Sequence, residues 1–138
     1  MSDLTHLFEK IATGEIPSCK VYEDELVFAF LDIGPLSEGH TLVIPKQRYE
    51  TIADLPEDVA AAIGRVLPRL ARAVTAATGT SAYNVLVNIG AEAGQVVPHV
   101  HFHLIPKHAD GSGLGMRWDA GKLEKGEELA KRIAAGLA

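Results

Sequence analysis

Apolar and polar positions alternate along this chain of 138 residues with two different periods. A period of two is typical of a strand whose side chains point alternately to opposite faces. Several such runs are flanked by turn-forming or acidic residues. The pattern predicts five strands, over residues 19–23, 26–33, 40–45, 83–89 and 96–105.

A period of three to four residues predicts helices in three places. Ser2 is a candidate cap for a short first helix that ends near Gly14. An alanine-rich stretch over residues 56–77 predicts one long helix, which Pro68 is expected to bend or interrupt. A terminal helix is expected over residues 124–137, after a glycine-rich loop.

The order of these elements indicates an α+β fold. Strands lie on both sides of one long helix in the sequence, and few helices separate them, which favours a mostly antiparallel sheet. No repeat or long linker divides the chain. We therefore expect a single domain over residues 1–138, with a core over 1–107 and a variable loop and helix over 108–138.

Composition narrows the classes of function. The chain is 47% hydrophobic, carries a formal charge of −5 and has no basic cluster, which argues against a nucleic-acid-binding protein. The single cysteine, Cys19, excludes an internal disulfide and fits a reducing compartment. Neither a secretion signal nor an apolar run long enough to cross a membrane is evident. A cytoplasmic protein is the expectation.

Residues 98–106, PHVHFHLIP, hold three of the six histidines at alternate positions. On a strand, His99, His101 and His103 would share one face, and the apolar residues between them would share the other. Three aligned imidazoles have no structural purpose, although one histidine alone would more often be an ordinary surface residue. The row indicates chemistry.

A metal site is one interpretation of the row. Imidazole is a common zinc ligand, but same-face neighbours on a strand lie about 6.6 Å apart and the outer pair about 13 Å apart. Two of the histidines could share an ion, whereas all three would need a strongly distorted strand. We expect no metal and no cofactor.

Nucleophilic catalysis is the other interpretation. A neutral imidazole has a lone pair on one nitrogen and a proton on the other, and much of it is neutral at pH 7. Its adduct with phosphorus or carbonyl carbon is readily hydrolysed. Flanking imidazoles could donate hydrogen bonds to phosphoryl oxygens. The middle residue, His101, is then the best nucleophile.

Residues 94–103, GQVVPHVHFH, closely resemble the signature of the histidine triad (HIT) nucleotide hydrolases and transferases. The likeness covers most of the chain and fades over about the last thirty residues. Further blocks resemble the family in the family's order: residues 16–17, 22–24, 29–35, 40–46 and 88–90.

The resemblance implies a five-stranded antiparallel sheet with one long helix, and a homodimer in which two sheets join into one of ten strands. It implies that His101 attacks the α-phosphorus of a nucleotide and that water releases a nucleoside monophosphate. His99 and His103 would contact the phosphate or orient the nucleophile. His40 matches a fourth histidine near the phosphate, and Asp32 matches the residue that holds the ribose hydroxyls.

The remaining matches concern substrate binding. Phe8, Ile11, Phe30 and Ile33 match positions that line the base pocket, and Asn88, Gly94, Gln95 and Val97 match positions along the ribose and phosphate. From the residues alone, ordinary core packing is the favoured role of the two phenylalanines, and a turn or cap is the alternative role of Asp32. The other histidines, His6 and His108, are expected on the surface.

The chain also departs from the best-known branch, the Hint phosphoramidases. Val96 stands where that branch has a serine, Arg48 where it has a histidine, and the residues after Trp118 differ. The zinc-binding cysteine pair of some bacterial members is absent. The expected activity is hydrolysis of purine nucleoside phosphoramidates or related nucleotidyl conjugates. The alternatives are a Fhit-like dinucleoside polyphosphate hydrolase and a nucleotide-binding adaptor with little turnover.

Overall fold

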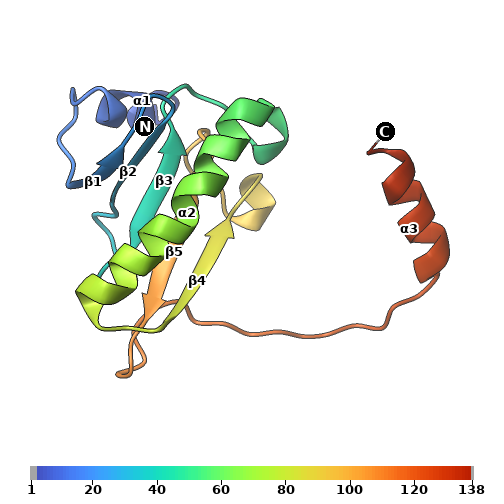
Figure 1. Cartoon of the computed structure of the whole chain (residues 1–138). Coiled ribbons are helices and arrows are strands. Elements are labelled where there is room, and N and C mark those ends of the chain that lie inside the picture. The colour runs from blue at the N-terminus through green and yellow to red at the C-terminus, as the bar shows by residue number, and fades with distance from the viewer. Residues whose placement is uncertain (1–2, 138) are drawn as a thin grey trace.

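The computed structural model describes residues 3–137, so the predicted cap Ser2 lies outside the described residues. Its centre is a five-stranded sheet in the order β1-β2-β3-β5-β4, and every neighbouring pair is antiparallel (Figure 1). The predicted α+β class and the five-stranded antiparallel sheet are confirmed. The strands are β1 (Lys20–Glu23), β2 (Val27–Leu31), β3 (Thr41–Pro45), β4 (Ala82–Val87) and β5 (Phe102–Lys107).

Three α-helices accompany the sheet: α1 (Leu7–Ala12), α2 (Glu57–Thr78) and α3 (Gly126–Ala135). Two 3₁₀ turns, Ile52–Asp54 and Ala91–Ala93, lie in the connections. The helix α2 runs across one face of the sheet (Figure 1). It ends at Gly79, whose φ of 70° is the left-handed conformation that glycine adopts most easily.

Pro68 was predicted to bend or interrupt the long helix; it does not interrupt it, because α2 is continuous through it, and the bend stays a prediction. A proline in a helix leaves the carbonyl four residues earlier without its hydrogen bond. Here both Pro68 and that residue, Gly64, lie on the exposed side of α2. Water can therefore satisfy the freed carbonyl, which makes the proline tolerable.

Alternation along the strands divides the core into two layers. Val27, Ala29 and Val43 point to the α2 side of the sheet and pack with the buried stripe of that helix. Their neighbours Phe28 and Phe30 point to the other side, where they pack with Phe8 and Ile11 of α1 and with further strand residues. Because both faces are covered, β2 and β3 are apolar almost throughout.

The fifth strand is shorter than predicted. It begins at Phe102, and residues 96–101 form an irregular segment before it. Pro98 has no N–H to give to a ladder, and the Val100 N–H donates to the Tyr49 carbonyl rather than to a strand. The second and fourth predicted strands also end earlier, at Leu31 and Val87. The triad histidines thus lie across the start of β5 rather than along one strand.

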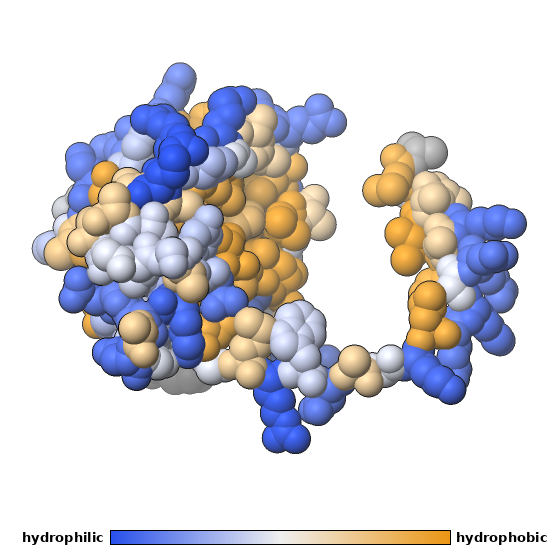
Figure 2. Space-filling model, turned by 60° about the horizontal axis from the view of Figure 1, so that its bottom comes forward, coloured by the Kyte–Doolittle hydropathy of each residue, from blue (hydrophilic) through white to orange (hydrophobic). Residues whose placement is uncertain are grey.

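The C-terminal arm, defined as residues 115–137, leaves the rest of the protein. It runs beyond β4, and α3 stands apart from the sheet (Figure 1). Every residue of the arm except Gly126 is exposed. The apolar side of α3 is turned toward the body of the protein across an open gap (Figure 2). Among residues 3–137, no helix combines the length and hydrophobicity that crossing a membrane requires.

Candidate active site

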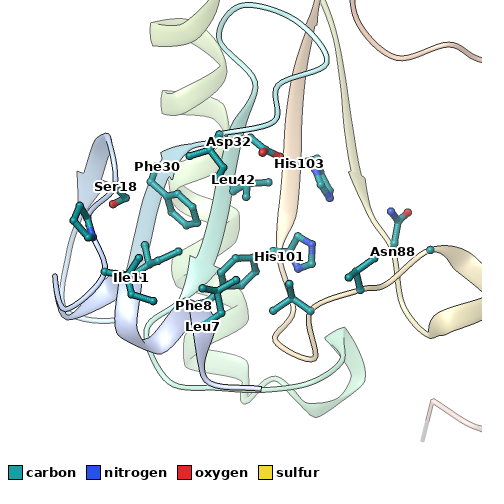
Figure 3. A pocket seen from close by; sticks show the side chains of 16 residues that line it. Leu7, Phe8, Ile11, Ser18, Phe30, Asp32, Leu42, Asn88, His101 and His103 are labelled. Atoms are coloured by element: carbon teal, nitrogen blue, oxygen red, sulfur yellow. The ribbon is translucent and has the colours of Figure 1, made fainter. Parts of the chain in front are cut away.

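A pocket of about 400 Å³ opens on the sheet face opposite α2. Its apolar side chains gather on the α1 side, where Phe8, Ile11 and Phe30 lie together (Figure 3). Its polar groups lie toward β5 and β4, where His103 lies beside Asp32 and His101 lies between Phe8 and Asn88 (Figure 3). The pocket therefore offers both an apolar surface and hydrogen-bonding groups to a single ligand.

The His101 ring is oriented by the main chain. Its Nδ1 lies 2.8 Å from the carbonyl oxygen of His99. A carbonyl can only accept, so Nδ1 carries the proton and Nε2 keeps its lone pair. The Phe8 ring packs edge-on against the imidazole, with the ring centroids 5.0 Å apart. Burial lowers the pKa of His101, which keeps the ring neutral at pH 7.

His40 and His103 form a directed pair. The Leu36 N–H donates to His40 Nδ1 at 3.1 Å, so the proton of neutral His40 is on Nε2. That Nε2–H donates to His103 Nδ1 at 3.0 Å. The proton of His103 is therefore on its own Nε2. Burial, with the neighbouring imidazoles, lowers the pKa of His103 to about 4, and burial also lowers the pKa of His40.

His99 lies elsewhere. Its side chain is fully buried, its Nε2–H donates to the Pro45 carbonyl at 2.8 Å, and its ring packs edge-on against Phe8. Its Nδ1 has no hydrogen-bond partner among the described residues. The expected row of three exposed imidazoles is therefore only partly present: His99 and His101 both pack on Phe8, but His99 is buried. His99 contacts His101 through its carbonyl, and its ring is not part of the pocket lining.

Asp32 is a turn aspartate that also lines the pocket, and its predicted contact with the ribose hydroxyls stays a prediction. Its Oδ1 accepts the Gly34 N–H at 2.8 Å, as an aspartate in a turn does. Its Oδ2 lies 3.5 Å from His40 Nε2, and the side chain lines the pocket. The carboxylate thus reinforces the proton on His40 Nε2 while it remains partly open to a ligand.

The ligand atoms of Asp32, His40 and His103 lie within 4.8 Å of one another. Such a set could hold a divalent cation in principle. However, the His40 nitrogen that faces the group carries a proton, since Leu36 occupies the other ring nitrogen. A metal would have to displace that arrangement, so hydrogen bonding explains the cluster better than metal binding does. The absence of a metal stays a prediction.

The structure brings most of the predicted binding residues to the pocket. Val97, Asn88 and Gly94 line it, and Ile33 lies at its rim with 97% of its surface exposed. Gln95 does not line it. The Gln95 side chain accepts the Gly90 N–H at 2.8 Å and donates to the Glu50 carbonyl at 2.7 Å, which fixes the turn beside the pocket.

Sequence reasoning missed several lining residues: Leu7, Ile16, Pro17, Ser18, Leu42 and Val96. The period-two pattern could have revealed Leu42, which shares a face with Ile44 on β3. His108, which was expected on the surface, is partly exposed, and its Nε2–H donates to the Glu38 carbonyl at 2.9 Å. His6 is exposed, as expected.

The fold and the pocket define an α+β protein with a neutral, backbone-oriented imidazole at a ligand-sized cavity. The chain belongs to the HIT family, because its residues 13–110 match the HIT domain. It is 42% identical to protein hit of Bacillus subtilis over 136 residues, which cover 96% of this chain and 94% of that protein. The predicted family is confirmed.

Two further proteins extend this comparison. The chain is 44% identical to the adenosine 5'-monophosphoramidase of Saccharomyces cerevisiae over 137 residues, covering 94% of this chain and 84% of the yeast protein. A crystal structure of a HIT family member from Bacillus subtilis superposes with a TM-score of 0.90 at 41% identity, covering 96% of each chain. The whole of the sheet is thus shared with solved HIT structures.

Proposed function

We propose that this protein hydrolyses purine nucleotides at the α-phosphate, with nucleoside phosphoramidates or related nucleotidyl conjugates as substrates. The observation that carries this proposal is the His101–His99 contact, which fixes the proton on Nδ1 and leaves Nε2 unprotonated. Membership in a family that includes an adenosine 5'-monophosphoramidase supports the reaction type.

The reaction has two steps. His101 Nε2 attacks the α-phosphorus, the bond from phosphorus to the leaving group breaks, and the leaving group takes up a proton from solvent. Water then attacks the same phosphorus and gives one proton to solvent, and the phosphorus–nitrogen bond to His101 breaks, which releases a nucleoside monophosphate. Negative charge develops on the phosphoryl oxygens in both steps. The His103 Nε2–H is the hydrogen-bond donor next to His101 that can stabilise it, as their ring centroids lie 5.0 Å apart.

The two sides of the pocket suit the two ends of a nucleotide. A purine base is flat and largely apolar, and Phe8, Ile11 and Phe30 offer it a matching surface. The Asp32 carboxylate can accept the hydroxyl protons of a ribose. Asn88 and Gly94 lie on the histidine side, and Gly94 has the positive φ of 99° that lets backbone approach a ligand closely.

A substrate panel tests the proposal. Purified protein would receive adenosine phosphoramidate, guanosine phosphoramidate and diadenosine polyphosphates side by side, and kcat/KM would be measured for each. We expect the phosphoramidates to be preferred and a nucleotide to be trapped covalently on His101 with a slow substrate. Preference for the polyphosphates would instead support the dinucleoside polyphosphate hydrolase. Tight nucleotide binding without turnover of any of them would support the adaptor.

The pH dependence of kcat/KM is expected to reflect the buried histidines. His101 must be neutral to attack, and burial lowers its pKa below the usual 6.5, with Asp32 opposing the shift only in part. The pKa of His103 is lowered to about 4. Activity should therefore persist as the pH falls through 6.5 and decline only in more acidic solution. Initial rates between about pH 4 and 8 check this, and an acid limb with its midpoint at or above 6.5 would contradict it.

The homodimer is a further part of the proposal. One side of β4 is the open edge of the sheet, and Tyr83 and Val85 on that strand are exposed. An open, apolar strand edge favours pairing with another copy. Two β4 strands joined in this way would give one sheet of ten strands. The helix α3 lies beyond the same edge (Figure 1), and its apolar side, which faces the body of the protein across a gap (Figure 2), agrees with a second copy there.

Analytical ultracentrifugation tests the dimer with a matched pair of variants. We expect Val85→Lys to sediment as a monomer, because a charge at the joining edge opposes pairing. The control is Val21→Lys on β1, the strand at the opposite edge, where valine is exposed to a similar degree, 42% against 45%. This variant should remain a dimer. A monomeric wild type, or loss of the dimer in the β1 variant alone, would contradict the proposed interface.

A further inference from the structure

The loop that joins β2 to β3 contains one side chain with an unusual environment. Residues 33–36 and 38 of this loop are exposed, yet Ser37 is only 6% exposed. The Ser37 hydroxyl donates to the Pro106 carbonyl on β5 at 2.6 Å. A buried hydroxyl in an exposed loop indicates a specific structural task.

That task is visible in the pairing of β3 with β5. Their last pair at this end is Thr41 with Leu104, so the Pro106 carbonyl lies past the end of the ladder. Ser37 supplies the missing donor. A buried carbonyl without a partner is costly, so the hydroxyl is a strong anchor for the loop.

Two weaker contacts hold the same loop from the segment after β5. The His108 Nε2–H donates to the Glu38 carbonyl at 2.9 Å, and the Gly113 N–H donates to the Leu36 carbonyl at 3.2 Å. Three hydrogen bonds thus tie residues 36–38 to residues 106–113. On its other side the loop reaches the buried His40, where the Leu36 N–H donates to His40 Nδ1, and His40 in turn contacts the pocket residue His103.

We propose that Ser37 is a positioning residue that selects the tautomers of His40 and His103. By fixing the loop, it keeps the Leu36 N–H on His40 Nδ1, which places the His40 proton on Nε2. This proton points to His103 Nδ1 and so leaves the His103 proton on Nε2, where it can donate to a ligand. The kinetic consequence rests on the proposed function, while the tautomers can be measured without it.

The direction of the hydrogen bond between His40 and His103 matters, as the reversed tautomers show. If Leu36 moved away, His40 could carry its proton on Nδ1 and turn a lone pair toward His103. His103 would then place its proton on Nδ1 and donate back to His40. Its Nε2 would present a lone pair to the ligand, which repels a phosphoryl oxygen instead of stabilising it. Asp32, at 3.5 Å from His40 Nε2, favours the first state, because in the second its carboxylate would face a lone pair instead of a proton.

The test compares Ser37→Ala with wild type by nitrogen-15 NMR of the imidazoles and by kinetics. In wild type, His40 and His103 should both show a protonated Nε2 and an unprotonated Nδ1. In Ser37→Ala both rings should show a mixture of tautomers. With a phosphoramidate substrate, kcat should fall about tenfold and KM should change less than about twofold, a loss equal to that of one typical hydrogen bond.

Ser37→Thr keeps the hydroxyl and should restore the wild-type tautomers and kcat. Ser81→Ala removes an exposed serine hydroxyl just before β4 and should change neither. If Ser37→Ala does not fold, His108→Ala loosens the same loop from its outer side and should shift the tautomers in the same direction.

Protonated Nδ1 on His40 or His103 in wild type would overturn the inference, as would unchanged tautomers and kcat in folded Ser37→Ala. Wild-type protein that hydrolyses none of the nucleotides would overturn the proposed function alone, because the NMR result still decides the tautomers.

Discussion

His101→Ala is expected to lower kcat for a phosphoramidate by at least about 10⁴-fold. Removal of a covalent nucleophile leaves only binding and charge stabilisation, and losses of this size are typical for enzymes of that kind. No other imidazole can replace it. His99 is turned into the core, and the His103 Nδ1 is occupied by His40. Stopped-flow or steady-state measurements of kcat with the purified variant check this expectation.

The matched control is His6→Ala, which removes an exposed imidazole that is not part of the pocket lining. It should keep the activity of wild type. Because the Phe8 ring packs on His101, the melting temperature of His101→Ala must also be recorded, so that a folding defect is not taken for a catalytic one. A folded His101→Ala with more than about a tenth of wild-type activity would show that another group is the nucleophile.

The sequence predicted an element correctly where its residue types alone determine the local structure. Runs of apolar, β-branched and aromatic residues predicted β2 and β3, because their side chains pack on both faces of the sheet. Alternation misled before β5. It extends back to His99, but Pro98 cannot pair and Val100 binds Tyr49, so His99 is buried ahead of the strand. A pattern of residue types does not contain these long-range contacts.

In the candidate active site, too, residue types were predictable and long-range contacts were not. Spacing alone identified His101 as the best nucleophile, and the resemblance supplied His40 and Asp32. Neither could predict the tautomers. The partners that fix them are main-chain groups, namely the carbonyl of His99 and the N–H of Leu36. Ser37 and Pro106 are 69 positions apart, so their contact depends on how β2, β3 and β5 are arranged in the sheet.

Gly39→Ala is expected to lower the free energy of unfolding by about 3 kcal/mol, and so the melting temperature by roughly 10 °C. Gly39 has a φ of 92°, a conformation that costs an alanine about 1 kcal/mol. A Cβ there would also lie 2.7 Å from Thr78 Cγ2, 3.2 Å from Pro106 Cγ and 3.3 Å from Val74 Cγ1. Thermal and urea unfolding would measure the loss.

The neighbours cannot easily yield to that methyl group. The Thr78 hydroxyl donates to the Val74 carbonyl at 2.7 Å, which holds its side chain at the end of α2. Gly14→Ala is the matched control, since Gly14 has a similar φ of 84° and open space around its Cβ position. It should cost only about 1 kcal/mol. Equal losses in the two variants would mean that backbone conformation alone matters at Gly39. A larger loss at Gly39 would show that the close packing of this loop against Thr78 and Val74 of α2 leaves no room for a methyl group.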